Sequence, residues 1–305
     1  MNEEELYKII EKIYNEKKSI RKSSEYIIGR KVLKLKDDLK HLRFKKITEK
    51  ILNNIKTKKY KEKFVSNAKN DKEYEIYNDN TKKIAIYTCI TGNYDNIYEP
   101  IIKEKKCDYI LFTNNSNLKS DKYKVMDIPE YILENNKDNI LINRYIKMHP
   151  FELFKDKYDY TIYLDGNIRV ISNVSSFVNC VSSKYGIAMH KHSIRNCIFK
   201  EEEVLKLLHK GNKEKIREQL NNYKSEGFPT EYGMLEANVI VTDIKNQKSK
   251  DIINDWWNEF IKSGSFRDQL SLPYVLWKNN IKVEEIATLG NNVYDNPKIE
   301  VESHK

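Results

Sequence analysis

The sequence predicts an α/β protein in which helices flank a mainly parallel β-sheet and a basic helical arm precedes the body. From residue 83 onward, short runs rich in β-branched and aromatic residues alternate with helix-length segments, a pattern typical of parallel sheets covered on both faces. The 305 residues suit one large domain or one domain with an appendage. Hydrophobic residues make up 39% of the chain and tyrosines number 21, which is too apolar and too aromatic for a disordered protein.

Residues 1–66 form the basic arm. Two groups of apolar residues recur there at helical spacing, the first at Leu6, Ile9, Ile10, Ile13 and Tyr14 and the second at Val32, Leu35, Leu39 and Leu42. The arm holds 20 Lys and Arg against 10 Asp and Glu, and the rest of the chain holds 35 of each kind, so the net charge of +10 comes from the arm. We expect two amphipathic helices, which either dock on the body or on another copy of the chain, or lie on anionic lipid.

Residues 67–82 are polar and turn-rich and are expected to be a linker to the body at 83–305. Within the body, the apolar runs predict strands at 84–90, 109–113, 124–128, 160–164, 185–189, 238–242 and 281–286. Longer periodic segments predict helices at 139–155, 200–222, 248–262 and 267–279. In such sheets, ligands bind beyond the carboxyl ends of the strands.

Composition and missing motifs exclude several classes of function. A body without net charge is unlike a nucleic-acid enzyme, so we expect no nucleic-acid partner. The first residues have no leader-like pattern and no stretch reaches about eighteen apolar residues, so we expect a cytoplasmic protein. The four cysteines form no CxxC pair, and the GxGxxG, P-loop, HExxH and GxSxG motifs are absent.

The most informative motif is an apolar strand that ends in Asp165-Gly166-Asn167. Asp165 and Asn167 can turn their oxygen atoms toward one hard cation, while Gly166 lets a diphosphate approach the backbone. This arrangement suits a metal-bridged sugar nucleotide. The alternative is a plain hairpin turn, which Asp-Gly also favours.

An ordered set of motifs resembles a known family. These are Tyr87-Thr-Cys-Ile-Thr-Gly-Asn-Tyr-Asp95, Tyr109-Ile-Leu-Phe-Thr-Asn114, Arg144-Tyr-Ile-Lys147, Tyr163-Leu-Asp-Gly-Asn167, His190 to Arg195 and Arg267-Asp-Gln269. They occur in the order seen in the glycosyltransferase-like domains formerly filed as domain of unknown function 616, which include plant seed-mucilage proteins and bacterial proteins of surface-polysaccharide loci. The resemblance runs from about residue 83 to about 290, and it implies the GT-A fold.

The resemblance also assigns candidate donor-binding residues. At the end of the first strand it implies a nucleobase and ribose site made of Thr88, Thr91, Gly92, Tyr94 and Asp95. Arg144 and Lys147 lie three apart on one face of a helix, where a fixed positive pair suits a diphosphate, although a solvated basic face is the alternative. Asn167 departs from the acidic residue usual at this position, which weakens the expected binding of Mn²⁺ or Mg²⁺.

Three further side chains are candidates for the chemistry. Asp268 and Gln269 resemble the Asp-Gln pair of retaining family 8 glycosyltransferases, which faces the anomeric carbon; the alternative for Asp268 is a helix N-cap. Glu236 begins a predicted strand and is the remaining catalytic candidate.

We therefore expect a glycosyltransferase that moves a sugar from a nucleoside-diphosphate sugar to a surface-polysaccharide or lipid-linked glycan, with the arm supplying peripheral membrane attachment or self-association. One alternative is a non-catalytic module that senses a sugar nucleotide or binds a membrane or partner. The other is a hydrolase that uses the same site with water as acceptor.

Overall fold

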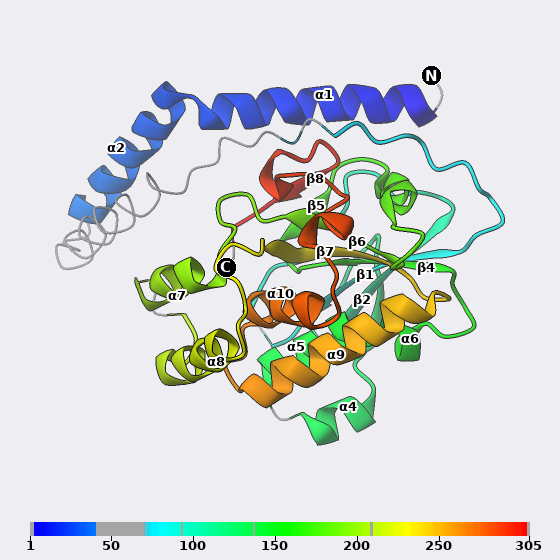
Figure 1. Ribbon diagram of the computed structural model, residues 1–305. Coiled ribbons are helices and arrows are strands. Elements are labelled where there is room, and N and C mark those ends of the chain that lie inside the picture. The colour runs from blue at the N-terminus through cyan, green and yellow to red at the C-terminus, as the bar shows by residue number, and fades with distance from the viewer. Residues whose placement is uncertain are drawn as a thin grey trace.

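The structure, a computed structural model, describes residues 3–40, 70, 72–92, 94–136, 138–207 and 210–303. Residues 41–66 of the predicted arm, and residues 67–69 and 71 of the predicted linker, lie outside this described part. The body is a layered α/β unit, and the first helix of the arm runs along one side of it (Figure 1).

A six-stranded sheet forms the centre of the body. Its strands lie in the order β3 (Lys124–Asp127), β2 (Cys107–Thr113), β1 (Ile84–Ile90), β4 (Tyr160–Leu164), β7 (Leu235–Asp243) and β6 (Ile187–Lys191). The pairs β2–β3, β1–β2 and β1–β4 are parallel, which confirms the predicted mainly parallel sheet. Strand β7 is antiparallel to both β4 and β6, so its first residues lie beside the end of β4.

The sheet is covered on both faces, as the unbroken apolar runs of its strands require. All seven residues of β1 are buried. Alternate side chains of β1 point into two cores: Ala85, Tyr87 and Cys89 into the first, and Ile84, Ile86 and Ile90 into the second. The first core is closed by α5 (Asn139–Met148), α9 (Gln247–Ser263) and α10 (Asp268–Lys278). The second is closed by η1 (Val174–Cys180) and by a small antiparallel sheet of β5 (Ile168–Val170) and β8 (Ile299–Val301).

The remaining elements surround these layers. They are the helices α4 (Glu130–Asn135), α6 (Pro150–Leu153), α7 (Ile198–Leu207) and α8 (Lys213–Ser225), with the short 3-10 turns η2 (Val283–Glu285) and η3 (Val293–Asp295).

The structure corrects three of the predicted elements. The helix predicted at 139–155 is divided into α5 and α6 because Pro150 starts a new helix at its first position. The segment predicted as one helix at 200–222 is divided around Gly211, which has a φ of +76°. The strand predicted at 281–286 is wrong: Ile281, Val283 and Ile286 are buried as expected, but the segment forms the 3-10 turn η2 without a strand partner.

In the arm, helix α1 (Glu3–Lys22) docks on the body, mainly through charged side chains. Lys18 Nζ donates hydrogen bonds to the carbonyl oxygens of Asn296 (2.5 Å) and Ile299 (2.6 Å). Lys17 and Arg21 both pair with the buried carboxylate of Glu300. The docked face is therefore mixed: Leu6, Ile10 and Tyr14 are partly buried beside these charged side chains, while Ile9 and Ile13 remain about half exposed.

Helix α2 (Ser24–Lys40) turns away from the body (Figure 1). Its large apolar side chains Ile27, Ile28, Val32 and Leu33 are all exposed. Within the described ranges, neither arm helix nor any other helix has the length and apolar composition needed to span a membrane.

Candidate active site

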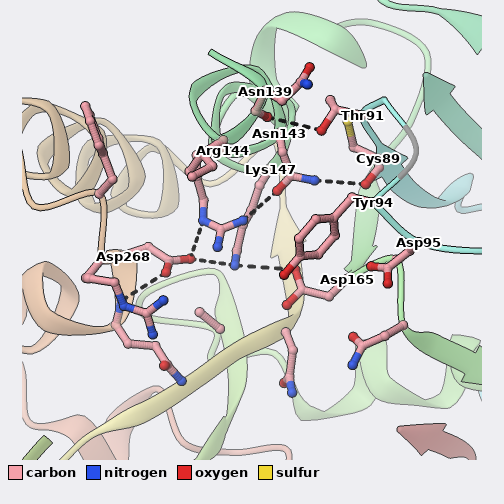
Figure 2. Close-up of a pocket in the computed structure, with 18 of the residues that line it drawn as sticks. Cys89, Thr91, Tyr94, Asp95, Asn139, Asn143, Arg144, Lys147, Asp165 and Asp268 are labelled. Carbon is pink, nitrogen blue, oxygen red and sulfur yellow. Dashed lines mark hydrogen bonds and ion pairs between the residues drawn. The ribbon is translucent and has the colours of Figure 1, made fainter. Parts of the chain in front are cut away.

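A cavity of about 680 Å³ opens at the carboxyl ends of the parallel strands, where α/β sheets bind ligands (Figure 2). Six segments form most of its lining: the loop after β1, one face of α5, the turn after β4, the start of β7, the 210–212 loop and the 265–269 segment that begins α10. Tyr294 and Val301 complete it. Because β7 is antiparallel to β4, its first residues reach the same edge as the ends of the parallel strands. All the candidate residues predicted from the sequence except Gly92 and Thr88 line this cavity.

The loop after β1 is fixed by hydrogen bonds from neighbouring loops. Thr91 Oγ1 donates to the carbonyl oxygen of Asn139 at 3.2 Å, and the backbone N–H of Gly92 donates to Asn114 Oδ1 at 2.7 Å. Gly92 adopts a φ of +57°, a conformation that favours glycine. It shapes the loop without lining the cavity itself. Thr88 lies inside β1, buried, and does not reach the cavity.

Helix α5 presents its polar side chains to the cavity because its apolar face, with Ile142 and Ile146, packs into the core. Asn143 Nδ2 donates to the carbonyl oxygen of Cys89 at 2.8 Å, which ties the helix to the end of β1. Arg144 in turn donates to Asn143 Oδ1 at 2.6 Å. The helix is thereby fixed with Arg144 and Lys147 facing inward.

Asp268 joins these two cations in a buried cluster. Arg144 Nε lies 3.0 Å and Lys147 Nζ lies 2.7 Å from the same oxygen, Asp268 Oδ2. The side chains of Lys147 and Asp268 are only 1% and 5% exposed. Burial by itself would raise the pKa of Asp268, but the charges of Arg144 and Lys147 hold that pKa well below its usual range. Asp268 is therefore ionised at neutral pH.

Asp268 is not the N-cap of α10, since Arg267 occupies that position and makes no side-chain capping bond. The neighbouring Trp256 fixes the start of this helix, because its Nε1 donates to the carbonyl oxygen of Asp268 at 2.9 Å. The N-cap alternative for Asp268 therefore does not apply. The solvated-face alternative for Arg144 and Lys147 does not apply either, because both side chains are largely buried.

The turn after β4 carries Asp165, Gly166 and Asn167. It is not a hairpin, because β4 leads into β5 and β5 pairs with β8 instead. Asp165 Oδ1 lies 3.7 Å from Lys147 Nζ, so Lys147 stands between Asp165 and Asp268 (Figure 2). A Cβ atom added to Gly166 would lie 3.3 Å from Asp95 Oδ2, so the Asp95 carboxylate lies directly beside this turn.

Asp165 and Asn167 are the metal ligands predicted from the sequence. Asn167 Nδ2 donates to the carbonyl oxygen of Glu302 at 3.0 Å, which leaves Oδ1 as its ligand atom. In the part of the chain that the structure describes, no group of three or more His, Cys, Asp and Glu side chains could hold a metal ion. These oxygens therefore fit a hard cation only when the phosphate oxygens of a bound donor complete its coordination.

Glu236, buried at the start of β7, pairs with the partly buried Gln269 of α10. Gln269 Nε2 donates to Glu236 Oε2 at 3.0 Å, and Ser193 Oγ donates to Oε1 at 3.3 Å. Burial raises the pKa of Glu236 above its usual range, although these hydrogen bonds oppose the shift. His192 lies 3.7 Å away, but burial lowers its pKa to about 4, so it is neutral and does not offset the Glu236 charge.

The cavity also contains residues that the sequence motifs did not single out as site residues, namely Asn143, Lys210, Asn238, Arg267 and Tyr294. Asn143 could have been predicted from the sequence, because it lies four residues before Lys147 and therefore on the same helix face. Tyr294 reaches the cavity from η3, near the C-terminal end, and no local pattern marks it.

Comparison with known proteins supports the resemblance found in the motifs. The family described as "TOD1/MUCI70, glycosyltransferase-like domain" matches residues 57–297, most of the chain and beyond the span of the motifs themselves. No curated protein sequence matches the chain significantly.

Several solved glycosyltransferases are similar in fold at low identity. The bifunctional glycosyltransferase WbbM shows a TM-score of 0.43 at 12% identity, over 74% of this chain and 46% of WbbM. The galactosyltransferase LgtC shows a TM-score of 0.42 at 11% sequence identity, over 72% of this chain and 86% of LgtC. Mouse xyloside xylosyltransferase 1 shows a TM-score of 0.41 at 8% sequence identity, over 72% of this chain and 98% of the mouse protein.

Proposed function

Because this chain belongs to the TOD1/MUCI70 glycosyltransferase-like domain family, we propose that it transfers a sugar from a nucleoside-diphosphate sugar to a surface-polysaccharide or lipid-linked glycan. One observation carries the proposal: two buried cations, Arg144 and Lys147, are held by one carboxylate in a cavity at the strand ends. Such a fixed, desolvated positive pair stabilises the negative charge that grows on a diphosphate as the sugar leaves.

In this proposal the donor lies across the cavity from the loop after β1 to the start of α10. Thr91, Tyr94 and Asp95 contact the nucleoside, with Gly92 shaping the loop. Arg144 and Lys147 contact the diphosphate. Thr88 has no part in it, because its side chain does not line the cavity.

The reacting sugar is proposed to lie between Asp268 and Glu236. Asp268 is ionised at neutral pH, so it can accept hydrogen bonds from sugar hydroxyls and keep Arg144 and Lys147 in place. Glu236 has a raised pKa, which suits a group that takes a proton from the acceptor hydroxyl near neutral pH. The Gln269 amide holds the Glu236 carboxylate in position.

A divalent cation, Mn²⁺ or Mg²⁺, is proposed to bind only with the donor, held by Asp165 and Asn167. When bound, it would supply further charge neutralisation for the diphosphate. Lys147 already provides a fixed positive charge beside Asp165, so donor binding does not rest on the metal alone.

The arm is proposed to attach the enzyme peripherally to a membrane through α2. Its exposed apolar side chains include Ile28 and Leu33, and Leu33 lines one surface with the basic residues Arg30, Lys31 and Lys34. This combination suits an anionic lipid surface, such as the cytoplasmic leaflet, which is where we propose that the protein works. Helix α1 is less suited to this role, because Lys17, Lys18 and Arg21 contact the body.

Incubation of the purified protein with sugar-labelled nucleoside-diphosphate sugars and candidate glycan acceptors tests the proposal. Transfer predicts release of the nucleoside diphosphate together with an acceptor that is heavier by one sugar. Release of free sugar at the same rate with and without acceptor would show a hydrolase. Donor binding without any turnover across the panel would show a sensing module.

A further inference from the structure

The cavity holds a second pair of cations, Lys210 and Arg267, which the donor-binding proposal does not use. Arg267 directly precedes Asp268, and Figure 2 shows Asp268 and Asp95 on opposite sides of the view. Arg267 and the Lys210 loop therefore belong to the Asp268 end of the cavity. The nucleoside is assigned to the Asp95 end.

Among the described residues, neither of these cations is neutralised by an ion pair. Arg144 and Lys147 both contact Asp268 Oδ2, whereas Arg267 influences Asp268 only over a longer distance. Within the described part of the chain, Arg267 Nε is buried and has no hydrogen-bond partner. A buried donor without a partner is unfavourable, so a ligand that accepts a hydrogen bond from Arg267 Nε would complete the site.

The Arg267 stem and backbone contact neighbouring segments that restrict the position of this residue. A Cβ atom added to Gly211 would lie 3.4 Å from Arg267 Cδ, so the arginine stem packs against the 210–212 loop. The backbone N–H of Arg267 donates to Ser265 Oγ at 3.2 Å. The loop itself is anchored by Asn212, whose side chain caps the first turn of α8. The Arg267 stem is thus held against the 210–212 loop, and the exposed Lys210 lies on that loop, which lines the same cavity.

We propose that Lys210 and Arg267 bind a phosphate group carried by the acceptor. The acceptor class is then a phosphate ester, either a phosphorylated glycan or polyol, or a glycan linked to lipid through phosphate. A guanidinium presents parallel N–H donors that match phosphate oxygens, and an ammonium adds a point charge. This inference rests on the proposed function, because Arg144 and Lys147 are assigned there to the donor's own diphosphate.

The test compares phosphorylated ligands with their neutral counterparts. Binding is measured by ligand-observed NMR titration, with and without a saturating nucleoside diphosphate. The probes are glycerol 3-phosphate against glycerol, and a short-chain isoprenyl phosphate against the corresponding alcohol. Wild type is compared with Arg267→Gln, Lys210→Gln and the control Lys213→Gln, which removes a lysine that does not line the cavity.

We expect the phosphorylated member of at least one pair to bind wild type and Lys213→Gln at least ten-fold more tightly than its neutral partner. Arg267→Gln and Lys210→Gln should reduce this preference to less than three-fold, while their affinity for nucleoside diphosphate stays within two-fold of wild type. The pair that shows the preference identifies the soluble or the lipid source of the phosphate.

Equal binding of phosphorylated and neutral probes to wild type would overturn the inference. A ten-fold loss of nucleoside-diphosphate affinity in Arg267→Gln would also overturn it, because these cations would then hold the donor. The proposed function fails by a different result, namely the absence of nucleoside-diphosphate binding to wild type. The two failures are therefore distinguishable.

Discussion

At the scale of single residues, the account depends on two carboxylates with opposite environments. Asp268 is held ionised by Arg144 and Lys147, whereas burial raises the pKa of Glu236 even though the Arg195 charge and the hydrogen bonds from Ser193 and Gln269 oppose this shift. Pairs of acidic groups whose surroundings move their pKa values apart are typical of sites that need one fixed anion and one proton acceptor.

Replacing Asp268 by Asn should destabilise the protein, because Arg144 and Lys147 would remain buried without the carboxylate that both contact, and Asp165 lies farther away, at 3.7 Å from Lys147. Breaking a buried ion pair from one side costs about 3–5 kcal/mol, and chemical unfolding at pH 7 measures this loss. The pKa of Asp268 lies below its unfolded value, so its contribution is present above the ordinary carboxyl range and is lost as the pH falls through the folded pKa.

The control for this change is Asp251→Asn, which alters an exposed carboxylate on α9. It should change the free energy of unfolding by less than about 0.5 kcal/mol. If Asp268→Asn were as stable as the control, the buried charge cluster would not hold this site together.

Replacing Glu236 by Gln should lower turnover and raise stability. Loss of a general base typically costs about 10²- to 10⁴-fold in rate. The pKa of Glu236 is raised in the folded protein, so its ionisation destabilises the fold as the pH rises from the ordinary carboxyl range through the folded pKa. The melting temperature of Glu236→Gln should therefore exceed that of wild type at pH 8 and approach it at low pH. Wild-type turnover in this variant would exclude Glu236 as the proton acceptor.

At the scale of elements, the sequence predicted the strands that are buried on both faces, since their unbroken apolar runs determine the pattern. It did not reveal that β7 runs antiparallel to β4, a long-range pairing that local periodicity does not encode. That reversal brings Glu236 into the cavity at the end of β4. Its catalytic role stays a prediction, and no reason for this position was available from the sequence. The strand predicted at 281–286 was wrong for a related reason, because a segment that contains a 3-10 turn can bury its apolar residues in a similar pattern.

The candidate site was predictable where its residues occur in short motifs, as in Asp165-Gly166-Asn167 and Asp268-Gln269. Tyr294 could not be predicted, because it reaches the cavity through the packing of η3. The Asp268 cluster joins side chains 121 residues apart in the sequence, and no local pattern records that contact.

Helix α1 should depend on Glu300 for its docking. The Glu300 carboxylate is nearly buried and accepts hydrogen bonds from Lys17 (3.1 Å) and Arg21 (2.5 Å). Glu300→Gln should weaken both contacts by a total of about 1–2 kcal/mol and speed amide exchange in residues 3–22 by roughly ten-fold. Exchange in α1 that matches the control Glu16→Gln, on an exposed position of the same helix, would contradict this role.

At the scale of the whole molecule, the positive charge of the arm is divided between two uses. Part of it, on α1, contacts the body, and part of it, on α2, faces outward with apolar side chains. The sequence shows that the excess charge lies in the arm. It could not show which helix contacts the body and which faces outward, because both helices are amphipathic and basic.

The double variant Ile28→Ser/Leu33→Ser should reduce co-sedimentation of the full chain with anionic vesicles by at least ten-fold at low salt. Both side chains are exposed, so the fold and donor binding should remain unchanged. Ile261→Ser, an exposed position on the body, is the matched control and should bind vesicles as wild type does. Wild-type protein that stays in the supernatant with anionic vesicles at low salt would rule out this membrane attachment.

The central claim is that the cavity binds the diphosphate of a sugar nucleotide through Arg144 and Lys147. Calorimetric titration of wild type with a nucleoside diphosphate, the monophosphate and the nucleoside tests it most directly, with Lys147→Met as the variant and Lys262→Met, an exposed position on α9, as its control. The account predicts that wild type and the control prefer the diphosphate to the nucleoside by at least 100-fold, and that Lys147→Met, once shown to be folded, loses most of this preference. Equal affinity of wild type for the diphosphate and the nucleoside, across all the bases tried, would contradict it.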